Sequence, residues 1–111
     1  MEKIESQEPY LSLTLNGEYD NFTDFYDTNK KRIYEAIIET FGGFYNLENE
    51  KLKLVIFSKI NDFEWETEFN FVRNDYQILN KDILPYFESL EDYENCLKIK
   101  KLYNDFEIIK K

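Results

Sequence analysis

The fold is decided by residues 51–72, which read KLKLVIFSKINDFEWETEFNFV. In the first half of this stretch, Leu52 and Leu54 begin an apolar series at every second position, and in the second half aromatic rings alternate with polar residues. A period of two directs alternate side chains to opposite faces of an extended chain. Lys51 to Ile60 and Phe63 to Val72 are therefore predicted to be β-strands.

These two strands are predicted to form a hairpin. Residues 61–62, Asn-Asp, suit a two-residue turn between antiparallel strands. The turn imposes three cross-strand pairs, two apolar and one of opposite charge: Leu52 with Phe71, Leu54 with Phe69, and Lys59 with Glu64. Apolar pairing and charge pairing thus favour the same register.

A further strand is predicted near the N-terminus. Residues 1–9 form a polar leader, which we expect to be partly disordered. From Tyr10 to Leu15, leucines recur at every second position and hydroxyl residues lie between them. Asn16-Gly17 is a turn signal, so the strand is predicted to end there.

A helix is predicted between this strand and the hairpin. Its apolar positions recur at helical spacing: Ile33, Ile37 and Phe41, widened by Tyr34 and Ile38. Thr28 is the predicted N-terminal cap, although Phe22, Phe25 and Tyr26 leave an earlier start open. Gly42-Gly43 is predicted to end the helix in a left-handed conformation.

The C-terminal third is predicted to contain one helix and one strand. Asp82 can cap a helix with Pro85 in its first turn, running to about Asn95. The alternation from Leu97 to Lys100 predicts a strand, although the later apolar residues Leu102, Tyr103 and Phe106 leave a helix open across residues 97–111. A short extra strand from Phe106 to Ile109 completes the prediction.

The resulting element order is β-α-β-β-α-β, which predicts a single α+β domain over residues 1–111. The expected architecture is a ferredoxin-like two-layer sandwich, with an antiparallel sheet and two helices on one face.

The charge balance disfavours several classes of partner. Asp and Glu number 23 against 14 Lys and Arg, a net charge of -9, which repels both a phosphate backbone and an anionic membrane. The longest strongly apolar run, Leu54 to Phe57, is far shorter than a membrane span, and the N-terminus lacks the layout of a signal peptide. Cys96 is the only cysteine, so no intramolecular disulfide can form. We expect a cytoplasmic protein that binds neither nucleic acid nor membrane.

The residue inventory also disfavours most catalytic chemistry. The chain has no histidine, and it has no glycine-rich phosphate-binding loop or nucleophile elbow. We therefore expect no enzymatic activity, no catalytic residue, no metal site and no cofactor. A single alanine, Ala36, and only two arginines indicate AT-rich coding usage, which favours a bacterial or phage origin.

The candidate site is a set of carboxylates and tyrosines. Glu64, Glu66 and Glu68 lie on one face of the predicted second hairpin strand, at intervals of about 6.6 Å. A second group belongs to the predicted C-terminal helix: Glu88, Glu91, Asp92 and Glu94, with Tyr86 and Tyr93 as candidate anchors.

These features favour a small acidic protein that binds and inhibits a basic, nucleic-acid-handling protein, as immunity proteins, antitoxins and phage anti-defence inhibitors do. One alternative is a self-associating structural or regulatory module, a homodimer for instance, whose contact residues would be Val55, Phe57 and Val72. The other is a carboxylate-dependent enzyme using Mg²⁺, with the ligands Asp20, Asp24 and Asp27.

Overall fold

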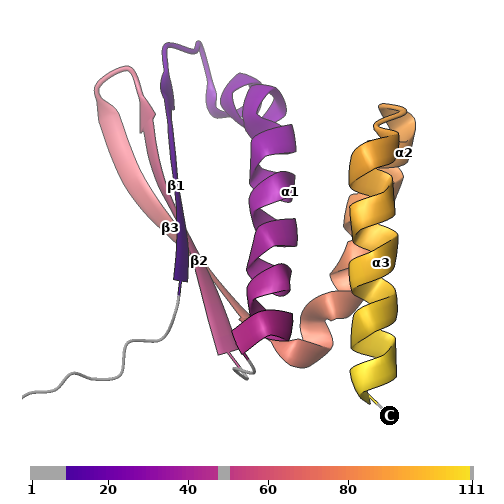
Figure 1. The fold of residues 1–111 in the computed structure, drawn as a ribbon. Coiled ribbons are helices and arrows are strands. Elements are labelled where there is room, and N and C mark those ends of the chain that lie inside the picture. The colour runs from indigo at the N-terminus through magenta and orange to yellow at the C-terminus, as the bar shows by residue number, and fades with distance from the viewer. Residues whose placement is uncertain (1–9, 48–50, 111) are drawn as a thin grey trace, which may run out of the picture.

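The computed structural model describes residues 10–47 and 51–110, which form an α+β arrangement of three strands and three α-helices. The leader predicted at residues 1–9 lies outside the described residues. The element order is β-α-β-β-α-α, with two short helical turns before the second α-helix (Figure 1). The elements are β1 (Tyr10–Gly17), α1 (Phe22–Leu47), β2 (Lys51–Ile60), β3 (Phe63–Val72), a 3-10 turn (Arg73–Tyr76), a π-helical turn (Leu79–Ile83), α2 (Leu84–Ser89) and α3 (Tyr93–Lys110).

The predicted hairpin is confirmed. β2 and β3 pair antiparallel, and the three predicted cross-strand pairs are present: Leu52 with Phe71, Leu54 with Phe69, and Lys59 with Glu64. Asn61, the first residue of the turn, has a φ of 55°. Asparagine tolerates this left-handed conformation better than most residues, which is why it suits a tight hairpin.

The sheet is mixed, so the predicted antiparallel sheet and the ferredoxin-like order are wrong. β1 pairs with β2 in parallel, and β3 lies at the far edge, whereas a split βαβ unit would insert β3 between them. The 26-residue helix α1 spans about 39 Å and returns the chain to the start of the sheet. Leu54, Val55 and Ile56 are all buried, as expected of a central strand. β3 carries glutamates on one face and suits an edge.

The C-terminal strands predicted from Leu97 onward are also wrong, because residues 93–110 form the single helix α3. The buried side chains Cys96, Ile99 and Phe106 recur at helical spacing, whereas Leu97 is 68% exposed. The leucine in the apparent alternation therefore faces solvent. The helix predicted from Asp82 to Asn95 is interrupted between α2 and α3. Pro85 does lie in the first turn of α2, as predicted.

Helix α1 is longer at both ends than predicted. It begins at Phe22, because the Asn21 side chain accepts a hydrogen bond from the backbone N–H of Asp24 at 2.9 Å. It also continues through Gly42-Gly43, neither of which has a positive φ. A Cβ atom at Gly43 would lie 3.3 Å from Leu52 Cδ1. The second glycine therefore permits close approach of α1 to β2 rather than ending the helix.

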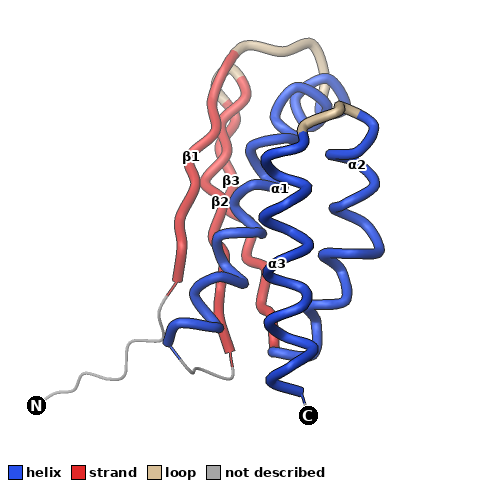
Figure 2. Tube along the Cα trace, turned by 45° about the vertical axis from the view of Figure 1, so that its right-hand side comes forward, coloured by secondary structure: helices blue, strands red, loops and turns tan. Residues whose placement is uncertain are grey.

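The elements form three layers rather than the predicted two. Helix α1 lies between the sheet on one side and α2 with α3 on the other (Figures 1 and 2). A middle layer must bury several faces, and accordingly five residues of one α1 stretch are buried: Ala36, Ile37, Ile38, Thr40 and Phe41. No described helix covers the opposite face of the sheet (Figure 1). We call this the open sheet face.

Candidate protein-binding surface

The three glutamates of β3 project from the open sheet face and are exposed. Glu64 lies 3.9 Å from Lys59, and Glu68 lies 3.8 Å from Lys53, measured between carboxylate oxygen and ammonium nitrogen. Glu66 has no ion pair among the described residues. Two of the three carboxylates are thus already partly neutralised within the same sheet.

The helical carboxylates lie around the turn between α2 and α3, where the backbone is strained. Glu91 has a φ of 57°. Its N–H donates to Glu88 O, and the N–H of Asp92 donates to Phe87 O, both at 3.0 Å. This left-handed helix end is usually formed by glycine, because a side chain there costs about 1–2 kcal/mol. The chain therefore holds a carboxylate where glycine would be less strained.

Exposed apolar side chains alternate with these carboxylates along the chain from α2 to α3. Leu90, Tyr93 and Leu97 are 48%, 69% and 68% exposed. Glu88, Glu91 and Glu94 are exposed as well, and none has an ion pair within the described chain. We call the six together the acidic turn: Glu88, Leu90, Glu91, Tyr93, Glu94 and Leu97. It combines apolar contact area with unpaired negative charge.

Asp92, also predicted as a site residue, is occupied within the chain. Its carboxylate accepts hydrogen bonds from the backbone N–H and the side-chain amide of Asn95, at 3.2 and 2.9 Å, and so caps α3. Lys31 lies 3.5 Å away on α1. The Asn95 hydrogen bonds and the Lys31 charge hold the Asp92 pKa below its usual value. Its role is to fix α3 against α1.

The two predicted tyrosine anchors lie in different surroundings. Tyr86 is half-buried and packs edge-on against Tyr34 of α1, with ring centroids 5.0 Å apart. The ammonium of Lys30 lies 5.3 Å from the Tyr86 ring centroid. Tyr93, by contrast, is among the most exposed large side chains of the described residues. Only Tyr93 is free to act as an anchor for another molecule.

The structure does not join the two groups of predicted site residues. The β3 glutamates lie on the open sheet face, whereas the acidic turn lies beyond α1 in the outer helical layer (Figure 1). Leu90 belonged to no predicted surface group, and Leu97 was missed because it was assigned to the strand predicted from Leu97 to Lys100. The spacing of Cys96, Ile99 and Phe106, taken as one buried stripe, could have placed Leu97 outside.

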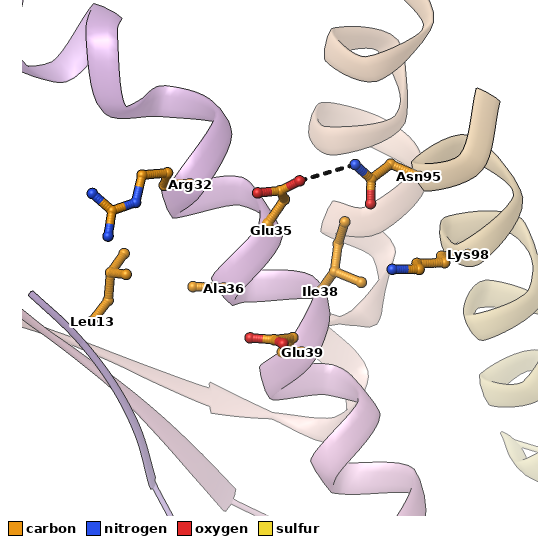
Figure 3. A pocket seen from close by; sticks show the side chains of 8 residues that line it. All are labelled: Leu13, Arg32, Glu35, Ala36, Ile38, Glu39, Asn95 and Lys98. Carbon is orange, nitrogen blue, oxygen red and sulfur yellow. Dashed lines mark hydrogen bonds between the residues drawn. The ribbon is translucent and has the colours of Figure 1, made fainter. Parts of the chain in front are cut away.

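A groove of about 360 Å³ lies between β1, α1 and α3 (Figure 3). Its lining residues are Leu13, Arg32, Glu35, Ala36, Ile38, Glu39, Asn95 and Lys98. The Asn95 amide donates to Glu35 at 3.1 Å, and Arg32 donates to the Thr14 carbonyl at 3.4 Å. Two acidic and two basic side chains balance, and the lining offers no hydroxyl or thiol nucleophile. The groove therefore lies where the sheet, α1 and α3 meet.

The aspartates proposed as Mg²⁺ ligands lie near the start of α1. Asp20 and Asp24 line a shallow depression with Glu18 and Asn61, while Asp27 lies further along the helix. Across residues 10–47 and 51–110, no three acidic or thiol side chains are arranged to hold one metal ion. The described structure therefore offers no metal centre on which a mechanism could be built.

Comparison with known proteins gives no relative: no protein-family model, curated protein or solved structure matches the chain. Among the helices described here, none combines the length and apolar character needed to cross a membrane.

Proposed function

We propose that the protein binds a basic, nucleic-acid-handling protein and inhibits it, in the manner of an immunity protein, antitoxin or phage anti-defence inhibitor. The acidic turn is the proposed contact surface. The observation that carries the proposal is Glu91, a carboxylate held at positive φ within a group of exposed, unpaired glutamates. Backbone strain of this kind persists where the surrounding structure or a function maintains it.

The composition of the acidic turn supports protein binding. Tightly bound interfaces place a few aromatic or aliphatic anchors at their centre and polar groups at their rim. Tyr93 and Leu97 lie one helical turn apart on α3, and Leu90 precedes them at the end of α2. Three glutamates accompany these anchors, so the surface fits an apolar recess bordered by lysine or arginine.

The charge of the whole chain supports a basic partner. A net charge of -9 attracts a positively charged surface over distances of about 10 Å at ordinary ionic strength. A nuclease or nucleic-acid-binding complex displays lysine and arginine where phosphates bind. Carboxylates of the acidic turn would occupy these positions and thereby exclude the nucleic acid.

Differential affinity capture tests this proposal. The baits are the wild-type chain, the variant Glu88→Lys/Glu91→Lys/Glu94→Lys, and a control reversing exposed acids elsewhere, Glu18→Lys/Asp27→Lys/Asp82→Lys. Each of the three reversals raises the net charge by two, so both variants change from -9 to -3.

We expect the wild type and the control to retain the same basic protein from a host lysate at low salt, and the acidic-turn variant to lose it. The purified partner must then lose its nucleic-acid cleavage or binding when the wild-type chain is added. If the two variants captured the partner equally well, the acidic turn would not be the binding site. If the partner's activity were unaffected by the wild-type chain, the protein would not be an inhibitor.

A further inference from the structure

We propose that the open sheet face binds the same face of a second copy of this chain, independently of the proposed inhibitory function. The sheet has two edges and two faces through which two copies could associate. Most of the helix-covered face packs against α1, although Phe63 and Phe69 at its β3 edge remain 58% and 36% exposed. Three surfaces remain: the β1 edge, the β3 edge and the open sheet face.

Both edges carry features that oppose strand addition. At β1, the Arg32 guanidinium donates to the Thr14 carbonyl at 3.4 Å and occupies part of the strand's hydrogen-bonding edge. At β3, pairing with the same strand of another copy would bring two rows of glutamates side by side on one face. Charged residues along an edge strand are a common protection against this kind of pairing.

The open sheet face has two stripes of opposite charge. On β2, the basic stripe consists of Lys51, Lys53 and Lys59, and on β3 the acidic stripe consists of Glu64, Glu66 and Glu68. Three positive and three negative charges cancel, so this face is neutral on a molecule of net charge -9. It is therefore a surface on which two copies can approach without strong local repulsion.

Apolar side chains lie between and beyond these charges. Phe57 and Val72 are 42% and 45% exposed on this face, whereas Val55, also predicted as a contact residue, is only 5% exposed and adds little contact area. Exposed apolar area with charged residues around it is typical of interaction surfaces. Covering Phe57 and Val72 is the expected driving force for association, while the two stripes determine orientation.

The stripes specify a two-fold arrangement. A two-fold axis parallel to the strands, placed between β2 and β3, lays the basic stripe of each copy over the acidic stripe of the other. Such a contact uses the same patch twice and closes at a dimer. Two sheets packed in this way lie about 10 Å apart.

The size of the face predicts a weak dimer. With the axis between β2 and β3, these two strands of each copy overlap and β1 lies outside the contact. Two strands at a spacing of about 4.8 Å and a length of about 30 Å present roughly 300 Å² in plan on each copy. This is smaller than a standard specific interface, which buries about 800 Å² on each partner, so dimerisation should be weak and depend on concentration in the micromolar range. Because α1 separates this face from the acidic turn, the dimer would display two acidic turns on its outer sides (Figure 1).

Reversing whole stripes tests both the surface and its orientation. The first variant is Glu64→Lys/Glu66→Lys/Glu68→Lys, with two basic stripes, and the second is Lys51→Glu/Lys53→Glu/Lys59→Glu, with two acidic stripes. Sedimentation velocity at concentrations from about 1 to 500 μM measures the mass of each variant, of their mixture and of the wild type. Circular dichroism verifies that each variant is folded, since the ion pairs removed are exposed and contribute little stability.

We expect the wild type to reach the mass of two chains, each variant to remain a monomer, and the equimolar mixture to form a dimer. Phe57→Ser should weaken the wild-type dimer at least tenfold, and Leu97→Ser, on the opposite side of the molecule, should leave it unchanged. A wild type that stays monomeric at 500 μM, or variants that dimerise alone as well as the wild type does, would overturn the proposal.

Discussion

Two regions of this molecule each carry three exposed glutamates, yet their surroundings differ. On β3, Glu64 and Glu68 have lysines 3.9 and 3.8 Å away on the next strand, and the backbone is regular. At the acidic turn, the glutamates have no ion pairs among the described residues, and Glu91 is held at a φ of 57°. The same residue type therefore completes a neutral sheet face in one place and leaves unneutralised charge in the other.

Charge reversal should produce the largest contrast between the two regions. Glu88→Lys/Glu91→Lys/Glu94→Lys is expected to weaken binding of the captured basic partner about 1,000-fold, since each reversal costs roughly 1.4 kcal/mol, or tenfold. Glu64→Lys/Glu66→Lys/Glu68→Lys, with an equal change in net charge, should weaken it less than about tenfold. Calorimetric titration measures the dissociation constants of both variants for the partner. Equal losses of affinity would show that net charge alone, and not the acidic turn, determines binding.

The two tyrosines should separate binding from stability. Tyr93→Ala is expected to weaken partner binding about 30-fold, which corresponds to an anchor worth about 2 kcal/mol, while the free energy of unfolding stays within about 0.5 kcal/mol. Tyr86→Ala should lower the free energy of unfolding by about 2 kcal/mol, because Tyr86 packs on Tyr34. For both variants, urea unfolding measures the free energy of unfolding and titration measures the affinity for the partner. The reverse pattern would move the anchor to Tyr86.

Glycine at Glu91 should stabilise the protein while weakening its binding. Glu91→Gly relieves the positive φ and is expected to raise the free energy of unfolding by about 1 kcal/mol, with about tenfold weaker partner binding. Glu94→Gly removes the same side chain from the first turn of α3 and should lower stability, by up to about 1 kcal/mol. Denaturant titrations of both variants provide the comparison. A destabilised Glu91→Gly chain would show that the turn is not strained.

The smallest effect concerns pH and Asp92. Its pKa is lowered in the folded protein, chiefly by the Asn95 hydrogen bonds, so its carboxylate contributes stability above the ordinary aspartate pKa of 3.8. That contribution is lost as the pH falls through the lowered folded pKa. Asp92→Asn preserves a capping side chain but removes the titration, so its unfolding free energy should decrease less steeply below pH 4 than that of the wild type. Parallel acid-unfolding curves would contradict this role of Asp92.

Features of the fold that depend on residues close together in the sequence could be predicted, whereas features that depend on distant residues could not. The hairpin was correct to the residue pair because Leu52, Leu54 and Lys59 specify a register through local partners. The position of β1 was not predictable in this way, because parallel pairing depends on the crossover through α1 and places β1 on the edge of β2 opposite β3. Gly43 looked like a helix end, although it serves contact with Leu52.

The candidate site was predictable in its residue types but not in its arrangement. Periodicity over a few residues near Leu97 suited a strand or a helix, and only the buried stripe through Ile99 and Phe106 distinguishes them. The turn at Glu91 lacks the glycine that would have marked it in the sequence. The strain at Glu91 can therefore be recognised only from the backbone conformation.

Displacement of nucleic acid from the captured partner tests the proposed inhibition at its core. A labelled oligonucleotide bound to the partner is titrated with the wild-type chain or with Glu88→Lys/Glu91→Lys/Glu94→Lys, and fluorescence anisotropy reports the fraction bound. We predict that the wild type releases the oligonucleotide at about one chain per binding site, and that the variant leaves it bound. A ternary complex, in which the chain and the oligonucleotide bind the partner together, would contradict the account.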